Sequence, residues 1–464
     1  MIAIVGWIAA ATTAFHLATA NLWGYHRDEF YYLACGRRLA WGFVDHPPIT
    51  PFLYRLAAVT FGTSKFGLRI IPAVLHGVTV VLIAMLAREL GGNPRAQMLA
   101  ALGAALAPLL LTTGHFLGTV TVEIAIGSGL VLLIVKLVNG ADPRLWIAVG
   151  VVCGVGLLNK WTFGLGIVGL GVGLLLLDRN VLTTRWLVVG VVVALLLVAP
   201  NVWWQARHGW AQLEFASSLQ DYAQTPITIP AQLFLLSAGA IVAIPGIRWL
   251  LRNPAGAPYQ FLLVAFGVAL ILVLMTGGKP YYTAAILPAF VGVGAVALSN
   301  TRGWLLPAAV LVLGVLSAPY ATPVLPLGIT RSMLATNPEL GEMLGWESFT
   351  HQIAALHRGH PDAGIVTANY SEAGSIELLA PELPQPASGH NSYWYWGPPA
   401  NSPDEVIAIT RDHAGLIRAF HDVARLSTVH TPGGVPNMED GTPIWLASGP
   451  RIPWPDLWPS FRRV

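Results

Sequence analysis

Charged residues are scarce in this chain. They make up 11% of its 464 residues, whereas 55% are hydrophobic, and a soluble globular protein carries roughly 25% charged residues. The composition therefore excludes an ordinary soluble protein and indicates a polytopic membrane protein. The formal net charge of +3 is too small to indicate nucleic-acid binding, so we expect no nucleic-acid partner.

Cysteine is scarcer still. Cys35 lies near a polar stretch and Cys153 inside an apolar run. Two cysteines so far apart in the sequence form neither a metal-binding pattern nor a disulfide pattern, and we assign them no role. Internal repeats and low-complexity tracts are not visible either.

Long apolar runs fill most of the first two thirds of the chain. A bilayer core of ~30 Å is crossed by about 20 apolar residues in a helix. The runs that qualify predict eleven spans, near 3–21, 70–90, 96–113, 119–138, 145–159, 162–178, 186–202, 231–250, 259–276, 282–299 and 303–318. The first run lacks a basic segment before it and a convincing cleavage site after it, so we expect a retained span rather than a cleaved signal peptide.

The basic residues of the short loops predict the orientation. If the N-terminus is cytoplasmic, most of them fall in the cytoplasmic turns, and the opposite short loops carry little beyond Lys160, Arg207 and Lys279. The positive-inside rule then places the first polar loop and the C-terminus outside. We therefore expect a multi-pass protein of the plasma membrane.

The composition changes after Pro319. Residues 319–464 contain charges, prolines and no run long enough to span a membrane. The segments GIVTANY and EVIAIT are typical of short buried strands, and SEAGSIELLA is typical of a helix. We expect a transmembrane domain over residues 1–318, with a large outer loop at 22–69, and an extracytoplasmic α/β domain over residues 319–464.

The stretch YHRDEFYYLACGRRLAWGFVDHPP, residues 25–48, is the densest polar segment near the predicted spans. If it is helical, the neighbouring carboxylates of Asp28 and Glu29 point about 100° apart. One of them then faces a cavity while the other orients it or pairs with Arg27 or Arg37. The alternative is a solvated loop with ordinary ion pairs.

Further charged residues lie at the outer ends of the predicted spans. These are Glu123, Lys160 and Lys279, with Tyr281 and Tyr282 close to the second lysine. Charges at membrane depth cost roughly 2.5–3.5 kcal/mol each, so they usually face a cavity or a partner. Two lysines with aromatic neighbours on one side of the membrane suit an anionic group such as a phosphate. The alternatives are a structural ion pair for Glu123, interfacial snorkelling for each lysine and an aromatic belt for the tyrosines.

Carboxylates, cations and aromatic rings on one side of a membrane suit a transfer reaction. A carboxylate takes a proton from a hydroxyl, and a cation stabilises a phosphate leaving group. Transfer from a lipid-linked phosphosugar would use all three kinds of residue. An ion-coupled transporter more often has its charges mid-membrane, where most spans of this chain have none.

A set of segments distributed along the chain carries a family resemblance: RDEFYYLACGRRLAWGFVDHPP, FGTSKFGLRIIPAV, GHFLGTVTVE, ADPRLW, GLLNKWT, NVWWQARHGWAQLEF, KPYY and ASGHNSYWYWGP. They resemble segments of the GT-C glycosyltransferases, in particular of bacterial membrane relatives of the protein O-mannosyltransferases and of the lipid A aminoarabinose transferases. The resemblance covers nearly the whole chain, and the Asp-Glu pair after the first span is its most specific part.

The resemblance implies a helical GT-C-like membrane fold and a sugar transfer from a polyprenyl phosphate to an acceptor hydroxyl outside the cytoplasm. Asp28 matches the general base with Glu29 as its companion, and Glu123 matches the second acidic position. The donor-phosphate residues that it implies are Lys160, Lys279 and Arg69. A further set of side chains are candidates for the substrate cleft: His46, His115, Tyr281, Tyr282 and His390. For His46 and His115 we favour the alternative, a packed or hydrogen-bonded histidine.

The mechanism that the resemblance implies is a single displacement with inversion at the anomeric carbon. The chain has no glycine-rich phosphate loop after a strand that would bind a nucleotide sugar. No cofactor is required and no metal site is assigned, although the carboxylates are compatible with a divalent cation. The acceptor stays open between protein, glycan and lipid, and the alternative function is a transporter or flippase of a lipid-linked sugar.

Overall fold

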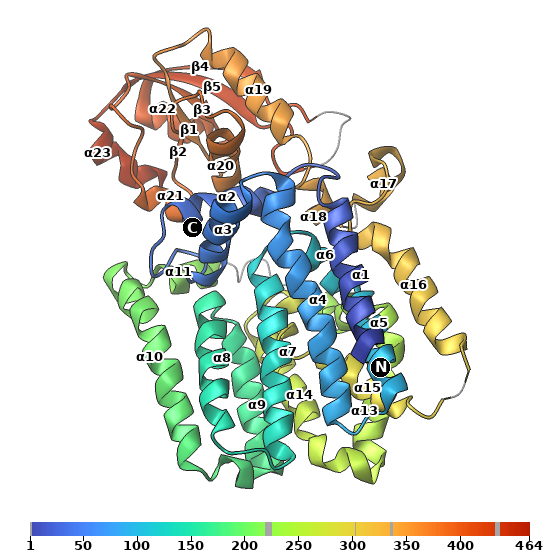
Figure 1. Ribbon diagram of the computed structural model, residues 1–464. Coiled ribbons are helices and arrows are strands. Elements are labelled where there is room, and N and C mark those ends of the chain that lie inside the picture. Colours follow the sequence, from blue (N-terminus) through green and yellow to red (C-terminus); the bar gives the residue numbers. More distant parts are fainter. Residues whose placement is uncertain (1, 219–224, 302, 335–336, 432–436) are drawn as a thin grey trace. The chain divides into compact units, whose positions relative to one another are not determined.

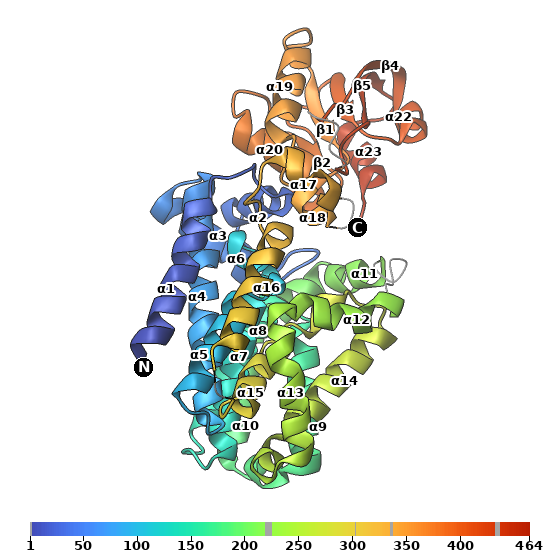
Figure 2. The same cartoon turned by 90° about the vertical axis from the view of Figure 1, so that its right-hand side faces the viewer.

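The computed structural model describes residues 2–218, 225–301, 303–334, 337–431 and 437–464. The chain is mostly helical (Figures 1 and 2). It forms two compact units, a helical unit made of Met1–Ala20 and His46–Val324, and a second unit made of Asn21–Asp45 and Leu325–Val464. The first half of the loop that we expected at 22–69 thus groups with the C-terminal residues, from which it is distant in sequence.

The helical unit contains long apolar helices. Several begin at side-chain caps: Ser64 accepts a hydrogen bond from the backbone N–H of Gly67, and Asn93, followed by Pro94, accepts from the N–H of Ala96, as helix N-termini favour. The helices are α1 (Ile2–Thr19), α3 (Ile49–Phe61), α4 (Lys65–Glu89), α5 (Pro94–Ala105), α6 (Pro108–His115), α7 (Thr119–Val138), α8 (Leu145–Asn159), α9 (Phe163–Leu177), η1 (Arg179–Leu182), α10 (Arg185–Arg207), α11 (Ala211–Ser218), α12 (Thr225–Leu236), α13 (Ala238–Arg252), η3 (Pro254–Tyr259), α14 (Phe261–Met275), η4 (Pro280–Thr283), α15 (Ala289–Ala297) and α16 (Leu305–Ala321).

Small residues allow some of these helices to approach closely. α8 packs along α10 (Figure 1). At this contact a Cβ added to Gly150 would lie 2.1 Å from the carbonyl oxygen of Gly190, and one added to Gly190 would lie 2.2 Å from that of Trp146. Close backbone approach at glycines is typical of helix pairs in membranes, where packing replaces the hydrophobic effect as the source of association.

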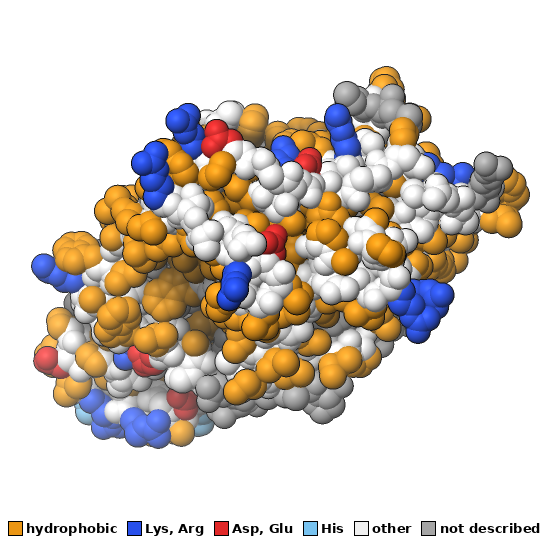
Figure 3. All heavy atoms as spheres, turned by 90° about the horizontal axis from the view of Figure 1, so that it is seen from below, with side chains coloured by type: hydrophobic (Ala, Val, Ile, Leu, Met, Phe, Trp, Pro, Cys, Tyr) orange, Lys and Arg blue, Asp and Glu red, His pale blue; other side chains and the backbone are white. Residues whose placement is uncertain are grey.

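The outer surface of the helical unit is apolar. Only 11% of the apolar window of α10 is buried, and Val188, Leu195 and Leu196 on this helix are largely exposed. Seen from below, hydrophobic side chains form patches between polar and backbone atoms, and charged side chains are scattered over the face (Figure 3). Apolar patches of this kind are unfavourable in water, so these helices are suited to contact with lipid.

Helix lengths agree with a membrane-spanning unit. Within the described residues, α4, α7 and α10 are each long and apolar enough to cross a membrane, and the bent pairs α5–α6 and α12–α13 raise this number to five. Other apolar helices of 10–17 residues are shorter than a full span. The predicted class, a helical membrane protein with a small C-terminal α/β domain, is confirmed, and the number of eleven spans stays a prediction.

Three predicted spans are not continuous helices. The span at 96–113 is bent by 59° between α5 and α6, and the span at 231–250 is bent by 109° between α12 and α13. The span at 282–299 is helical only from α15 onward, after the short turn η4. Pro108 is the first residue of α6, and Ala107 before it is extended, as a proline requires of the residue before it. Pro288 is the N-cap of α15. Ser237, at the remaining break, has φ +39°.

The second unit combines a helix from near the N-terminus with a C-terminal sheet. Its strand order is β2-β1-β3-β5-β4; β1 pairs in parallel with β2 and β3, and β5 pairs antiparallel with β3 and β4. Its elements are α2 (Arg27–Arg37), α17 (Leu327–Leu334), α18 (Pro338–Gly341), α19 (Trp346–His357), β1 (Gly364–Thr367), α20 (Tyr370–Leu379), β2 (Ala387–Ser388), α21 (Ser392–Tyr395), β3 (Glu405–Ile409), α22 (His413–Ala419), β4 (Phe420–Thr428), β5 (Pro443–Pro450), α23 (Trp454–Leu457) and η6 (Trp458–Phe461). The strands predicted in GIVTANY and EVIAIT and the helix predicted at 371–380 are confirmed.

The sheet is buried on both faces. Because side chains alternate along a strand, Ile365 and Ile407 pack with residues of α19 and α20, whereas Val366 and Ala408 pack with residues of α22 and α23. Phe30 of α2 belongs to the first of these clusters. The polar loop near the N-terminus is therefore tied into the core of the C-terminal sheet domain.

Candidate active site

The start of α2 separates the roles of the two neighbouring carboxylates. His26 is the N-cap, its ring nitrogen Nδ1 accepts from the N–H of Asp28 at 3.2 Å, and the carboxylate of Glu29 accepts from the N–H of His26 at 2.7 Å. This is a capping box, in which Glu29 is buried. The side chain of Asp28 is 33% exposed, so Asp28 is the carboxylate of this pair that solvent or a substrate can reach.

The Asp28 carboxylate is held by two neighbours. The hydroxyl of Tyr370 donates to Oδ1 of Asp28 at 2.9 Å, and Nε of Arg27 lies 3.9 Å from the same oxygen. The guanidinium of Arg27 lies over the ring of Tyr370, 5.2 Å from its centroid, and 3.7 Å from Glu342. Burial alone would lower the pKa of Arg27, but its negatively charged surroundings raise it, so Asp28 has a permanent cation beside it.

Stacked rings form a wall next to this carboxylate. Tyr370 stacks on Tyr31 at a centroid distance of 4.4 Å and on His390 at 4.8 Å. The hydroxyl of Tyr31 donates to Oδ1 of Asp45 at 2.7 Å. Burial raises the pKa of both tyrosines well above the ordinary value, and burial with the nearby arginines lowers the pKa of His390 to about 4. At neutral pH the tyrosines are thus hydrogen-bond donors and His390 is uncharged.

A second cluster lies within the helical unit and contains five of the predicted site residues. Nζ of Lys160, at the C-cap of α8, lies 3.1 Å from Oε2 of Glu123, which is fully buried on α7. The same ammonium lies 4.5 Å from the ring centroid of Tyr282 and 5.0 Å from that of Tyr281, and Nζ of Lys279 lies 5.8 Å from Tyr281. Such distances give favourable cation–π contacts. The structure therefore brings together residues from three separate parts of the sequence.

The two lysines of this cluster differ. The charge of Lys160 is neutralised by Glu123, whereas the exposed Lys279 has no carboxylate partner among the residues that the structure describes. The cluster carries a net charge of +1 and presents Lys279 to its surroundings. An anionic group would be attracted to Lys279 first, with the tyrosine rings beside it.

Arg69 and His115 lie in a third, buried cluster. Nη1 of Arg69 on α4 donates to the carbonyl of Ala20 at 2.7 Å and lies 3.1 Å from Nε2 of His115 on α6. His16 and His76 form a neighbouring pair with their ring nitrogens 2.8 Å apart. Arg69 is 1% exposed, and its two observed partners give it a part in packing the first helices.

His46 is buried, with Nδ1 3.0 Å from the carbonyl oxygen of Pro47.

Across the described ranges, no three His, Cys, Asp or Glu side chains are arranged to hold a metal ion.

Tyr370, which donates to Asp28, is the main candidate site residue that the sequence analysis missed. We placed it at the end of a predicted strand, but the strand ends at Thr367, and Asn369 caps the next helix by accepting from the N–H of Ser371. Residues just after a parallel strand often line sites in α/β domains, and this signal was available in the sequence. Its pairing with Asp28 was not, because the two residues are more than 300 positions apart.

Comparison with known proteins places this architecture in a known class. Residues 45–204 match the family model described as dolichyl-phosphate-mannose-protein mannosyltransferase. Among curated proteins, none matches the sequence significantly.

Solved structures match over much more of the chain. ArnT from Cupriavidus metallidurans, determined with bound undecaprenyl phosphate, has a TM-score of 0.65 at 14% identity, covering 96% of this chain and 97% of that chain. The chain has a GT-C fold. Arabinofuranosyltransferase AftD from Mycobacteria has a TM-score of 0.54 at 14% identity, covering 96% of this chain and 40% of that chain. The Archaeoglobus fulgidus oligosaccharyltransferase has a TM-score of 0.52 at 14% identity, covering 87% and 68%.

The resemblance to GT-C glycosyltransferases that the sequence indicated is thus confirmed for the fold. Identities of 14% carry fold information alone, and the GT-C fold leaves the reaction, the sugar and the acceptor to be argued from the residues of this chain.

Proposed function

We propose that this chain is a membrane glycosyltransferase that moves a sugar from a polyprenyl phosphate to an acceptor hydroxyl on the extracytoplasmic face, with inversion. The observation that carries the proposal is the state of Asp28. It is a partly exposed carboxylate at a helix N-terminus, fixed by the Tyr370 hydroxyl and next to the Arg27 cation. A carboxylate held in this way is suited to accept a proton from an acceptor hydroxyl as its oxygen attacks.

The GT-C fold and the family model support the reaction class. ArnT was determined with undecaprenyl phosphate, and an archaeal oligosaccharyltransferase of the same fold with dolichol phosphate and a peptide, at a TM-score of 0.50. A lipid phosphate as the donor of this chain agrees with both. The scarcity of charged residues and the apolar outer helices agree with a donor that lies in the membrane.

The bond changes are those of a single displacement. The acceptor oxygen forms the new bond to the anomeric carbon, the bond from that carbon to the phosphate oxygen breaks, and the acceptor proton passes to Asp28. The phosphate leaves with its negative charge, which cations stabilise. Lys279 and Lys160 remain the donor-phosphate residues that the sequence resemblance implies, and they would act as point charges. Glu29 is assigned no chemical step, because its carboxylate is bound in the cap of α2.

The extracytoplasmic face is part of the proposal and rests on the basic residues of the short loops. It places α2 and the sheet domain outside the cytoplasm.

The test is transfer of radiolabelled sugar from polyprenyl-phosphate donors by membranes that contain the wild-type chain, Asp28→Asn or the matched control Asp362→Asn at an exposed position. General-base catalysis contributes typically 10²–10⁴-fold, so Asp28→Asn should lose at least about 100-fold in rate at equal protein level, and the control should match the wild type. Equal transfer by Asp28→Asn would remove Asp28 from this role. An absence of transfer with every donor, combined with movement of lipid-linked sugar across vesicles, would favour the transporter instead.

A further inference from the structure

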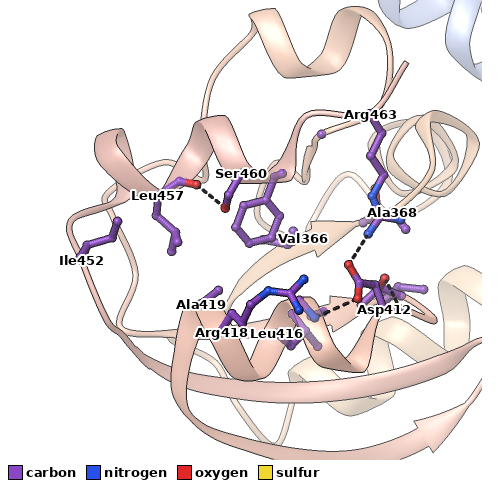
Figure 4. Close-up of a pocket in the computed structure, with 17 residues that line it drawn as sticks. Val366, Ala368, Asp412, Leu416, Arg418, Ala419, Ile452, Leu457, Ser460 and Arg463 are labelled. Carbon is purple, nitrogen blue, oxygen red and sulfur yellow. Dashed lines mark hydrogen bonds and ion pairs between the residues drawn. The ribbon is translucent and has the colours of Figure 1, made fainter.

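A cavity of about 340 Å³ lies in the sheet domain, formed entirely by residues of the second unit. Its floor is made by the last residues of β1 and β3 and its sides by α22, α23 and the segment that follows (Figure 4). Its volume lies within the range of small-molecule sites. Asp28, Arg27 and Tyr370 are not among its lining residues, so it is separate from the proposed catalytic carboxylate.

The topology of the sheet makes this edge a favourable place for a ligand. β1 and β3 are adjacent and parallel. The chain leaves β1 through α20 toward β2 on one side, and leaves β3 through α22 toward β4 on the other side. Where connections diverge from neighbouring parallel strands, a crevice opens at their carboxyl ends, and open α/β sheets bind ligands in such crevices.

The walls of the cavity are mainly apolar. Val366, Leu416, Leu457 and Phe461 line it, with Ala419 between them. In Figure 4 the side chains of Val366 and Leu457 come from opposite sides, the first from the sheet and the second from α23. A ligand that fills this space therefore gains from an apolar body.

The charged residues at the cavity are two arginines and one aspartate. Asp412 accepts from the N–H of Gly415 at 2.8 Å and lies 3.2 Å from Nη2 of Arg463 (Figure 4). Arg418 forms no ion pair with any residue that the structure describes. The cavity therefore has a net charge of +1 and one guanidinium that is not neutralised, and guanidinium groups bind carboxylates and phosphates in a bidentate manner.

Two of the hydroxyl groups of the lining already donate. Thr367 donates to the carbonyl of Asn369 and Ser460 donates to the carbonyl of Leu457, whereas Thr410 accepts from the N–H of Asp412. The hydroxyl groups of Thr367 and Ser460 are therefore not available as donors to a ligand with many hydroxyl groups. We propose that this cavity binds a small organic anion that joins one carboxylate or phosphate group to an apolar body.

The test uses the purified full-length protein in detergent and isothermal titration calorimetry. The probes are phenyl phosphate and benzoate, which carry both parts and distinguish the two anions, and inorganic phosphate and phenol, which carry one part each. The variants are Arg418→Gln, which removes the cation, Ala419→Phe, which fills the cavity, and Arg358→Gln, a matched control at an exposed position just after α19.

We expect phenyl phosphate or benzoate to bind the wild type and the control, and each single-part probe to bind at least tenfold more weakly. Hydrogen bonds to charged groups contribute about 1.5–3 kcal/mol, so Arg418→Gln should weaken binding by about tenfold or more, and Ala419→Phe should abolish it. The proposal is overturned if neither two-part probe binds, if Arg418→Gln binds as well as the wild type, or if inorganic phosphate binds as tightly as phenyl phosphate. None of these outcomes depends on sugar transfer.

Discussion

The hydroxyl of Tyr370 provides a direct test of how Asp28 is held. Tyr370→Phe removes the donor 2.9 Å from Oδ1 of Asp28 and leaves the ring, with its stacking on Tyr31 and His390, in place. A hydrogen bond to a charged group is worth about 1.5–3 kcal/mol. Because the side chain of Asp28 is 33% exposed and water can replace the lost donor, we expect the lower end, about 1.5 kcal/mol. This corresponds to a loss of about tenfold in kcat/KM.

The assay is sugar transfer from a polyprenyl phosphate, measured for the wild type, Tyr370→Phe, Asp28→Asn and the double variant. If Tyr370 acts through Asp28, the two losses are not additive, and the double variant should be no slower than Asp28→Asn. Tyr395→Phe on α21 is the matched control and should keep full activity. The reasoning would be refuted by full activity of Tyr370→Phe, or by a double variant whose loss equals the product of the single losses.

Three further predictions concern stability and orientation. Glu123→Ala leaves the Lys160 ammonium without its buried partner at 3.1 Å, and the loss of one partner of a buried pair lowers stability by about 3–5 kcal/mol. Adding Lys160→Met in a double variant should restore part of the lost stability. Thermal unfolding in detergent measures both effects, and equal melting temperatures for all variants would contradict the prediction. The pKa of His390 is lowered to about 4, below that of an unfolded histidine near 6.5, so protonation favours the unfolded chain. Folding stability should therefore fall by roughly 3 kcal/mol between pH 6.5 and pH 4. His390→Gln should flatten that part of the stability–pH profile, and an unchanged profile would refute the prediction. If the sheet domain is extracytoplasmic, Asp362→Cys in intact cells should react with a membrane-impermeant maleimide and Gly91→Cys should not; the reverse pattern would overturn the orientation.

Hydropathy predicted most of the helical unit, because the requirement to satisfy backbone hydrogen bonds in lipid leaves helices as almost the only choice for long apolar runs. Hydropathy did not predict the three positions where the helix is interrupted within an apolar run. The breaks before Pro108 and Pro288 were signalled by the prolines themselves, but the bend at Ser237 has φ +39° at a residue that carries no such signal.

The candidate site was predicted in part. Glu123, Lys160 and the two tyrosines were selected from the sequence, and the structure places them in contact because charges in apolar surroundings need partners. The hydrogen-bond partner of Asp28 could not be selected in this way. Tyr370 reaches it through the tertiary fold of a domain whose sequence begins about 300 residues later, and local patterns carry no information on such a pairing.

The second unit is made of two parts of the chain that are synthesised at different times. Its first piece, Asn21–Asp45, leaves the ribosome before the helices at His46–Val324, and its second piece, Leu325–Val464, leaves after them. During translation of the intervening helices, Phe30 lacks Trp346 and the β-strand isoleucines with which it packs, and Asp28 lacks Tyr370. Helix α2 therefore lacks these partners until the sheet domain has been synthesised. A nonsense change between the last predicted span and Tyr370 would spare every predicted span and still leave the candidate base without the Tyr370 hydroxyl.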